Sequence, residues 1–152
     1  MAGLRQNLHL LLIVGLFDKQ LIKKHKRTQT FTIDDFDLLI EYIGGADIIW
    51  ITTHCLAEVS NLIKQTNESA KVNLIQFLIS VTSEFKESYV NKNLIFNKDC
   101  FIRLGVADTG IIIKAKRVDC LFTVDLDLYL EALRNGYKAF NFNHMRMNRL
   151  IS

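Results

Sequence analysis

The sequence predicts an α/β fold in which helices cover both faces of a parallel sheet. Helix-like and strand-like segments alternate in the second half of the chain, and repeated strand–helix–strand units build parallel sheets. The strand-like runs at 47–52 and 118–124 are short and apolar without polar alternation, which is typical of strands buried on both faces. The right-handed crossover rule then limits the topology of such a sheet.

The expected elements of the first half follow from apolar periodicity and capping residues. Thr32 and Asp35 have the spacing of a capping box, and Gly44-Gly45 ends the helix that they begin. Thr53, after the strand at 47–52, is the expected cap of the next helix. The helices expected in this half cover residues 7–17, 19–27, 33–43, 54–66 and 69–85.

The second half is expected to contain shorter elements. Asp108 opens a helix with buried isoleucines, and Gly136 closes another as its C-cap. Besides these, the sequence suggests short strands at 1–4, 89–90, 118–124 and 138–142, and helices at 97–104 and 125–135.

Composition limits the class of protein. The chain has 152 residues, of which 49% are hydrophobic and 23% charged, so one domain over 1–152 can bury a core without staples. Its longest apolar run, Leu10–Phe17, is far below the roughly 18 residues of a membrane span, so no membrane partner is expected. A net charge of +3 permits a polyanionic partner without requiring one.

The cysteines and the N-terminus predict a cytoplasmic protein. Cys55, Cys100 and Cys120 are far apart in apolar runs, which favours buried thiols in a reducing compartment over a zinc site. The apolar run after Arg5 loosely mimics a secretory signal. It continues into Asp18 without a small-residue cleavage site, which favours a buried first helix.

Three carboxylates follow expected strand ends, where open parallel sheets form their sites. Asp125 follows the strand at 118–124, Glu58 follows the strand at 47–52, and Asp108 opens a helix. Together they would form an oxygen-rich site suited to Mg²⁺ or Mn²⁺ and to metal-assisted phosphodiester hydrolysis. Taken singly, each aspartate also fits a first-turn acid favoured by the helix dipole.

The segments around these residues resemble the PIN-domain family. Residues 51–61 look like the segment with the family's conserved glutamate, 103–108 like that with its next aspartate, and Thr123-Val124-Asp125 like its Thr-x-Asp. Residues 140–144 resemble the closing strand of one bacterial subgroup, which 11–15 and 27–39 also fit. The ordered combination of segments carries the resemblance over essentially the whole chain.

The resemblance implies a three-layer α/β/α PIN-like fold and a Mg²⁺- or Mn²⁺-dependent endoribonuclease that cuts single-stranded RNA. Many bacterial members are toxins of toxin–antitoxin pairs and many dimerise, so an antitoxin protein and a second copy are expected partners. The residues implied for the site are the metal-binding and catalytic carboxylates Glu58, Asp108 and Asp125, the hydroxyl of Thr123, and the supporting residues Asn7, Thr53 and Asn61.

Position 5 departs from the family pattern. The family's first acid lies in an Asp-x-Asn motif, which here reads Arg5-Gln6-Asn7. The exchange alters the local charge by two units, and each unit interaction at about 4 Å is worth on the order of 4 kcal/mol at an effective dielectric near 20. We therefore expect Mg²⁺ to bind weakly or not at all, with Arg5 pairing with Asp108 or Asp125 as a fixed cation.

Other interpretations remain open. The alternative function is a non-catalytic PIN-fold module that binds RNA or a protein partner. A small-molecule enzyme is disfavoured because no Gly-rich phosphate loop follows any strand. His54 and His144 lie near strand ends, where either could assist chemistry, and each is expected to make a structural hydrogen bond instead. The candidate RNA-binding residues Lys23, Lys24, Lys26 and Arg27 fit either phosphate contacts or a solvated helix face.

Overall fold

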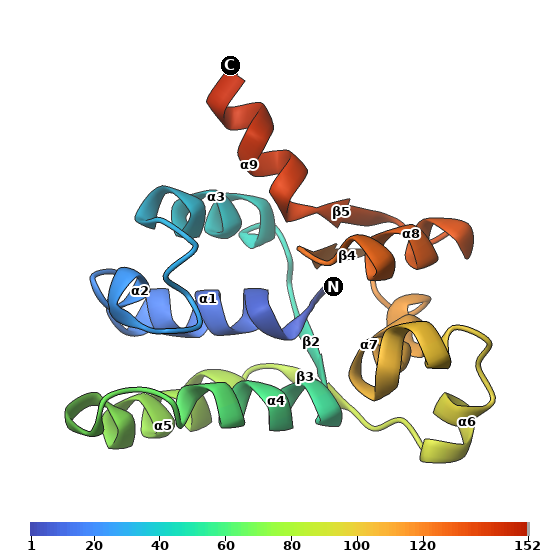
Figure 1. Cartoon of the computed structure of the whole chain (residues 1–152), viewed down its shortest axis with the longest axis horizontal. Helices are drawn as coiled ribbons and strands as arrows, with labels where there is room; N and C mark the ends of the chain where they lie inside the picture. The colour runs from blue at the N-terminus through green and yellow to red at the C-terminus, as the bar shows by residue number, and fades with distance from the viewer. Residues whose placement is uncertain (152) are drawn as a thin grey trace.

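A five-stranded, all-parallel sheet lies at the centre of the computed structural model, which describes residues 1–151 (Figure 1). The strand order is β3-β2-β1-β4-β5, so the predicted α/β class with a short parallel sheet is confirmed, and this order is compatible with a PIN-like fold. The strands are β1 (Ala2–Leu4), β2 (Ile49–Thr52), β3 (Lys86–Ser88), β4 (Cys120–Thr123) and β5 (Ala139–Asn141).

Helices connect the strands and extend the chain beyond the last one. They are α1 (Gln6–Phe17), α2 (Leu21–Lys24), α3 (Ile33–Ile43), α4 (Thr53–Ile63), α5 (Glu68–Thr82), α6 (Lys92–Phe96), α7 (Phe101–Ala115), α8 (Leu126–Arg134) and α9 (Phe142–Ile151). No helix of the described residues is long and apolar enough to cross a membrane.

The sheet separates two hydrophobic clusters and so forms the middle of three layers. Leu4 and Phe122 belong to the larger cluster, which includes residues of α1, α3, α4 and α5. Leu121 belongs to the smaller cluster, which includes residues of α7 and α8. Neighbouring residues of β4 thus face opposite layers, as successive strand side chains must.

Close packing explains the order of the first helices. The capping box at Thr32 and Asp35 is present, since each side chain accepts a hydrogen bond from the other residue's backbone N–H. A Cβ at Gly15 would lie 2.1 Å from the Phe36 ring, so only glycine lets α1 and α3 approach this closely.

Several sequence predictions need correction. Thr52, and not Thr53, caps α4, because the Thr52 hydroxyl accepts the Cys55 N–H while Thr53 donates to Glu87. The edge strand β3 precedes the expected 89–90. The helix expected at 97–104 starts later, at Phe101, but its expected break at Gly105 is present. Gly105 leaves helical geometry with a φ of 82°, which glycine tolerates, and α7 resumes beyond this kink.

The sequence did not predict α9. This helix extends away from the sheet (Figure 1) and is held by long-range ion pairs from Arg146 and Arg149 to the buried carboxylate of Asp35, at 3.0 and 2.9 Å. Because these pairs join residues more than 100 positions apart, no local pattern reveals them.

Candidate functional site

The candidate site forms at the carboxyl ends of the two central strands. Arg5 follows β1 and Asp125 lies two residues after Thr123, the last residue of β4. The Arg5 N–H donates to the Phe122 carbonyl at 3.0 Å, which continues the pairing of β1 with β4 to the strand ends. The parallel register therefore brings residues 5 and 125 to the same edge of the sheet.

Local capping fixes the Asp125 carboxylate. Its Oδ1 accepts the Leu128 N–H at 2.8 Å, which makes Asp125 the N-cap of α8. The buried hydroxyl of Thr123 accepts the Asp125 N–H at 2.9 Å. The two predicted site residues Thr123 and Asp125 thus lie next to each other. Their hydrogen bonds stabilise the turn from β4 into α8.

Asp108 reaches the same place from α7. The kink at Gly105 changes the direction of α7 three residues before Asp108. Asp108 is only 6% exposed. A carboxylate this deeply buried needs a partner to offset its desolvation.

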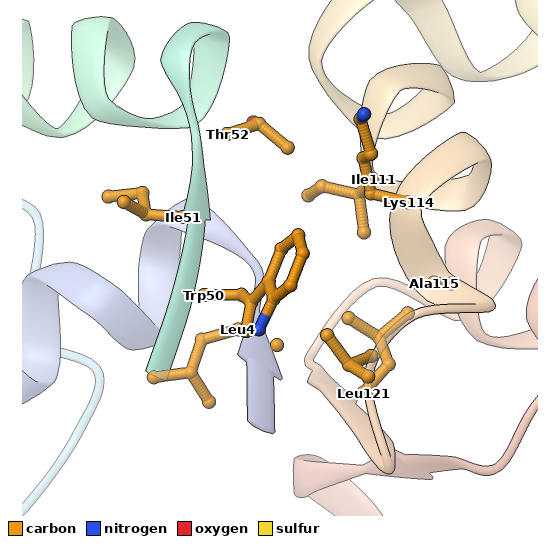
Figure 2. Close-up of a pocket in the computed structure, with 10 residues that line it drawn as sticks. Leu4, Trp50, Ile51, Thr52, Ile111, Lys114, Ala115 and Leu121 are labelled. Atoms are coloured by element: carbon orange, nitrogen blue, oxygen red, sulfur yellow. The ribbon is translucent and has the colours of Figure 1, made fainter. Parts of the chain in front are cut away.

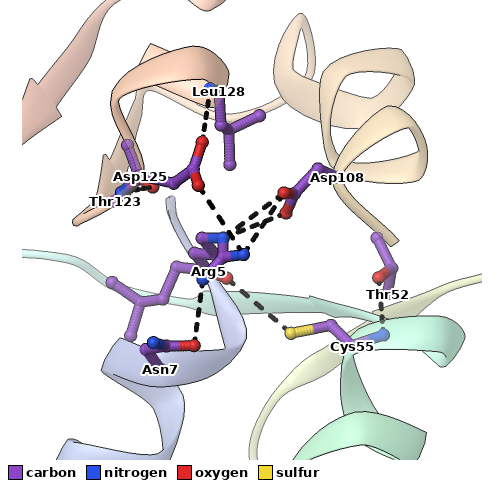
Figure 3. Close-up of polar contacts among 9 residues, drawn as sticks. Arg5, Asn7, Thr52, Cys55, Asp108, Thr123, Asp125 and Leu128 are labelled. Carbon is purple, nitrogen blue, oxygen red and sulfur yellow. Dashed lines mark hydrogen bonds and ion pairs between the residues drawn. The ribbon is translucent and has the colours of Figure 1, made fainter. Parts of the chain in front are cut away.

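Arg5 is that partner, and it lies between the two aspartates (Figure 3). Its Nε donates to Asp108 Oδ1 at 3.1 Å, and its Nη2 lies 3.4 Å from Asp108 Oδ2 and 3.9 Å from Asp125 Oδ2. Nη1 donates to Asn7 Oδ1 at 3.0 Å. The guanidinium is thus bound on three sides. Arg5 was expected to pair with Asp108 or Asp125, and in the structure it contacts both aspartates.

The electrostatics of Asp108 reflect its burial and its neighbours. Burial raises the pKa of Asp108 above its ordinary value, while the charge and hydrogen bond of Arg5 act to lower it. The negative charges of Asp125 and Glu58 add to the rise in pKa. Arg5 is therefore the group that favours the charged form of this buried carboxylate, against its burial and its acidic neighbours.

The residues present do not fit a divalent metal ion. The guanidinium occupies the space between the two carboxylates that would have to share such an ion. Within residues 1–151, no group of three or more His, Cys, Asp or Glu side chains is placed to hold a metal. We therefore assign no chemical step to a metal at this edge.

The other predicted site residues lie further from the guanidinium or serve local contacts. Glu58 is exposed on α4 and makes no hydrogen bond or ion pair with the described part of the chain, although its charge acts on Asp108. Asn61, one turn later, is also exposed. The Thr53 hydroxyl donates a hydrogen bond to Glu87 of β3, which is an edge strand of the sheet.

The structural hydrogen bonds expected for the two candidate histidines are not found among the described residues, where the Nδ1 of His54 is buried without a partner. Both side chains make packing contacts. His54 lies on α4 against α7, where a Cβ at Gly110 would be 3.9 Å from its Nδ1. His144 packs edge-on against Tyr129 with ring centroids 5.6 Å apart. Neither histidine touches Arg5 or its aspartates in the described structure.

The predicted RNA-binding cluster lies at the opposite end of α1 from Arg5. The 12 residues of α1 rise about 18 Å, which separates the cluster from the guanidinium. Lys23 and Arg27 donate to the neutral oxygens of Gln29 and Gln65. Lys24 and Lys26 are exposed, and none of the four cations has an ion-pair partner among residues 1–151.

An apolar cavity between the sheet and α7 is too small for a ligand. Trp50, Ile111 and Leu121 are among its lining residues (Figure 2), and its volume is about 20 Å³. That is close to the space of one water molecule. The cavity is a packing gap in the smaller hydrophobic layer.

Sequence reasoning missed the run Lys114-Ala115-Lys116-Arg117 at the end of α7. The density of cations in this run is a signal that the sequence contains, whereas its position at the amino ends of the strands is not. The structure shows that the three cations of this run line a groove with Lys98 and Tyr137.

No family model matches the chain, and no curated protein or solved structure matches it either.

Proposed function

We propose that this chain is a PIN-like domain that binds single-stranded RNA without cutting it. The observation that carries the proposal is the position of Arg5, whose guanidinium contacts both Asp108 and Asp125. A fixed cation there offsets the negative charge of the strand ends and leaves no shared space for a divalent ion. The resemblance to PIN domains supplies the fold and the substrate class of the proposal.

Unpaired positive charge supports the RNA part of the proposal. Lys23, Lys24, Lys26 and Arg27 gather around α2, have no ion-pair partners in the described chain, and belong to a chain of net charge +3. Phosphate contacts from such residues give affinity without sequence information.

Binding is tested with a labelled single-stranded RNA in EDTA. We expect affinity to fall as salt rises, and the quadruple alanine variant at positions 23, 24, 26 and 27 to reduce the slope of log affinity against log salt by about 3. Lys86→Ala/Lys92→Ala is a control with two exposed cations removed from β3 and α6. Equal affinity and slope in the quadruple variant and the parent would refute this role of the cluster.

The second candidate is a metal-dependent endoribonuclease of the toxin type. It is favoured by the retention of Asp108, Asp125 and Thr123 at the strand ends and by the action of the Glu58 charge on Asp108. Cleavage of RNA by the purified chain with Mn²⁺, abolished by Asp125→Asn, would select this candidate. An antitoxin protein and a second copy remain predicted partners under it.

A further inference from the structure

A basic groove opens at the amino ends of the strands, on the edge of the sheet away from Arg5. Lys114, Lys116 and Arg117 come from the end of α7 and the turn that leads into β4. Lys98 comes from the turn after α6, and Tyr137 from the turn just before β5. Three separate segments thus place four cations and one aromatic ring around one space.

The positive charges of the groove are not neutralised by the protein. In residues 1–151 none of its four cations forms an ion pair, and no carboxylate lines the groove. The acids nearest in sequence are Asp99, which is exposed, and Asp119, which binds the amino terminus. Four like charges around one space raise the local concentration of anions.

The remaining walls suit a flat, partly apolar group. Leu94 and Ile113 contribute aliphatic surface, and Tyr137 is half-buried against the smaller hydrophobic cluster. Gly136 adopts a positive φ of 76° that lets the chain turn sharply before Tyr137. The groove volume of about 320 Å³ falls within the usual range of small-ligand sites, roughly 300–1,000 Å³.

From these observations we infer that the groove binds a nucleoside phosphate, with the phosphates on the four cations and the base against Tyr137. The ligand chemistry is shared by a free nucleotide and by a nucleotide unit of single-stranded RNA. The inference goes beyond the proposed function because it concerns the other edge of the sheet and includes free nucleotides.

The test measures binding of ATP, of inorganic triphosphate and of a labelled ten-nucleotide oligo(U) in EDTA. The groove variant is Lys116→Glu/Arg117→Glu, whose two side chains are exposed. The matched control is Lys24→Glu/Lys26→Glu, which makes the same charge change at exposed positions near α2. Circular dichroism verifies that each variant is folded.

We expect the groove variant to lose at least about tenfold in affinity for the probes that the parent binds, because charge-assisted contacts are lost. The control keeps the parent's affinity for ATP and triphosphate. Loss for ATP and triphosphate without loss for oligo(U) identifies a free nucleotide as the ligand, and loss confined to oligo(U) identifies RNA. Either outcome supports the groove as a binding site for nucleoside phosphates.

A second variant tests the aromatic wall. Tyr137→Leu is expected to weaken ATP about fivefold or more through lost base stacking while leaving triphosphate unchanged. Binding of ATP and triphosphate with equal affinity, unchanged in Tyr137→Leu, would overturn the assignment of the base. Parent protein that binds no probe, or a folded groove variant with parental affinities, would overturn the site. Loss of oligo(U) binding in the α2 control alone would instead support the proposed function without the groove.

Discussion

The two edges of the sheet handle charge in opposite ways. At the carboxyl edge, Arg5 pairs with Asp108 and Asp125, so opposite charges meet within the protein. At the amino edge, no carboxylate of the described residues lines the groove that contains Lys116 and Arg117. Where opposite charges pair within the protein, the attraction for an external ion is weak. Unpaired cations attract an external anion. The resemblance to PIN domains predicts a site at the carboxyl edge, whereas the described structure has unpaired cations at the amino edge.

The largest expected effect breaks the pairing at the carboxyl edge. Arg5→Asp removes the cation from buried Asp108 and adds a third carboxylate, so in EDTA the free energy of unfolding should fall by about 3–5 kcal/mol. Chemical denaturation measures this change. Arg5→Lys, which keeps the charge, is the control and should lose less. If Arg5→Asp were as stable as the parent, the ion pairs would not hold this edge together.

A double variant then separates the loss of the ion pair from the cost of leaving a buried charge unpaired. Arg5→Met leaves Asp108 buried without its partner, but Arg5→Met/Asp108→Asn removes both charges. We expect the double variant to be more stable than Arg5→Met alone, because removing both partners of a buried pair costs less than removing one. Additive losses of unfolding free energy in a denaturant series would contradict the coupling.

The pH dependence of the free energy of unfolding tests the burial of α1, the helix that follows Arg5 at the carboxyl edge. Burial lowers the pKa of His9 on α1 to about 3. Between that value and the ordinary 6.5 the unfolded chain binds one more proton, so stability is lost as pH falls below 6.5. The loss from this group between pH 6.5 and pH 5 should be about 1–2 kcal/mol.

His9→Leu provides the comparison for this pH effect. The difference in unfolding free energy between parent and variant should change across that pH range, whereas the contributions of Asp108 and Asp35 cancel. A difference that is constant from pH 7 to pH 5 would show that folding does not shift the pKa of His9.

The smallest expected effect concerns the amino edge. Lys116→Ala/Arg117→Ala removes two exposed, unpaired cations, so the free energy of unfolding should change by less than about 0.5 kcal/mol per residue. Thermal denaturation measures this. A larger loss would mean that these side chains serve mainly to cap α7, and the contrast between the edges would weaken.

The sequence was sufficient for the architecture and for part of the site. Short apolar runs and the cap at Thr32 predicted the sheet and α3, because strand burial and helix capping are local properties. The placement of Asp125 at the end of β4 was equally readable. The pairing of Arg5 with Asp108 was expected through the resemblance, and it forms between residues 103 positions apart.

What the sequence did not reveal depends on three-dimensional assembly. The groove joins Lys98, Lys114 and Tyr137 only after α6, α7 and β5 have packed. Likewise, α9 depends on the buried carboxylate of Asp35, which belongs to α3. Contacts of this kind join segments that are distant in the sequence, so the local pattern of one segment does not predict its contact with the other.

The central claim is that Arg5 occupies the position of a metal ion, and Mn²⁺ titration calorimetry tests it most directly. We predict no saturable heat for the parent chain and saturable binding for folded Arg5→Asp, because a carboxylate then replaces the cation. Tight binding of Mn²⁺ by the parent, abolished by Asp125→Asn, would contradict the claim.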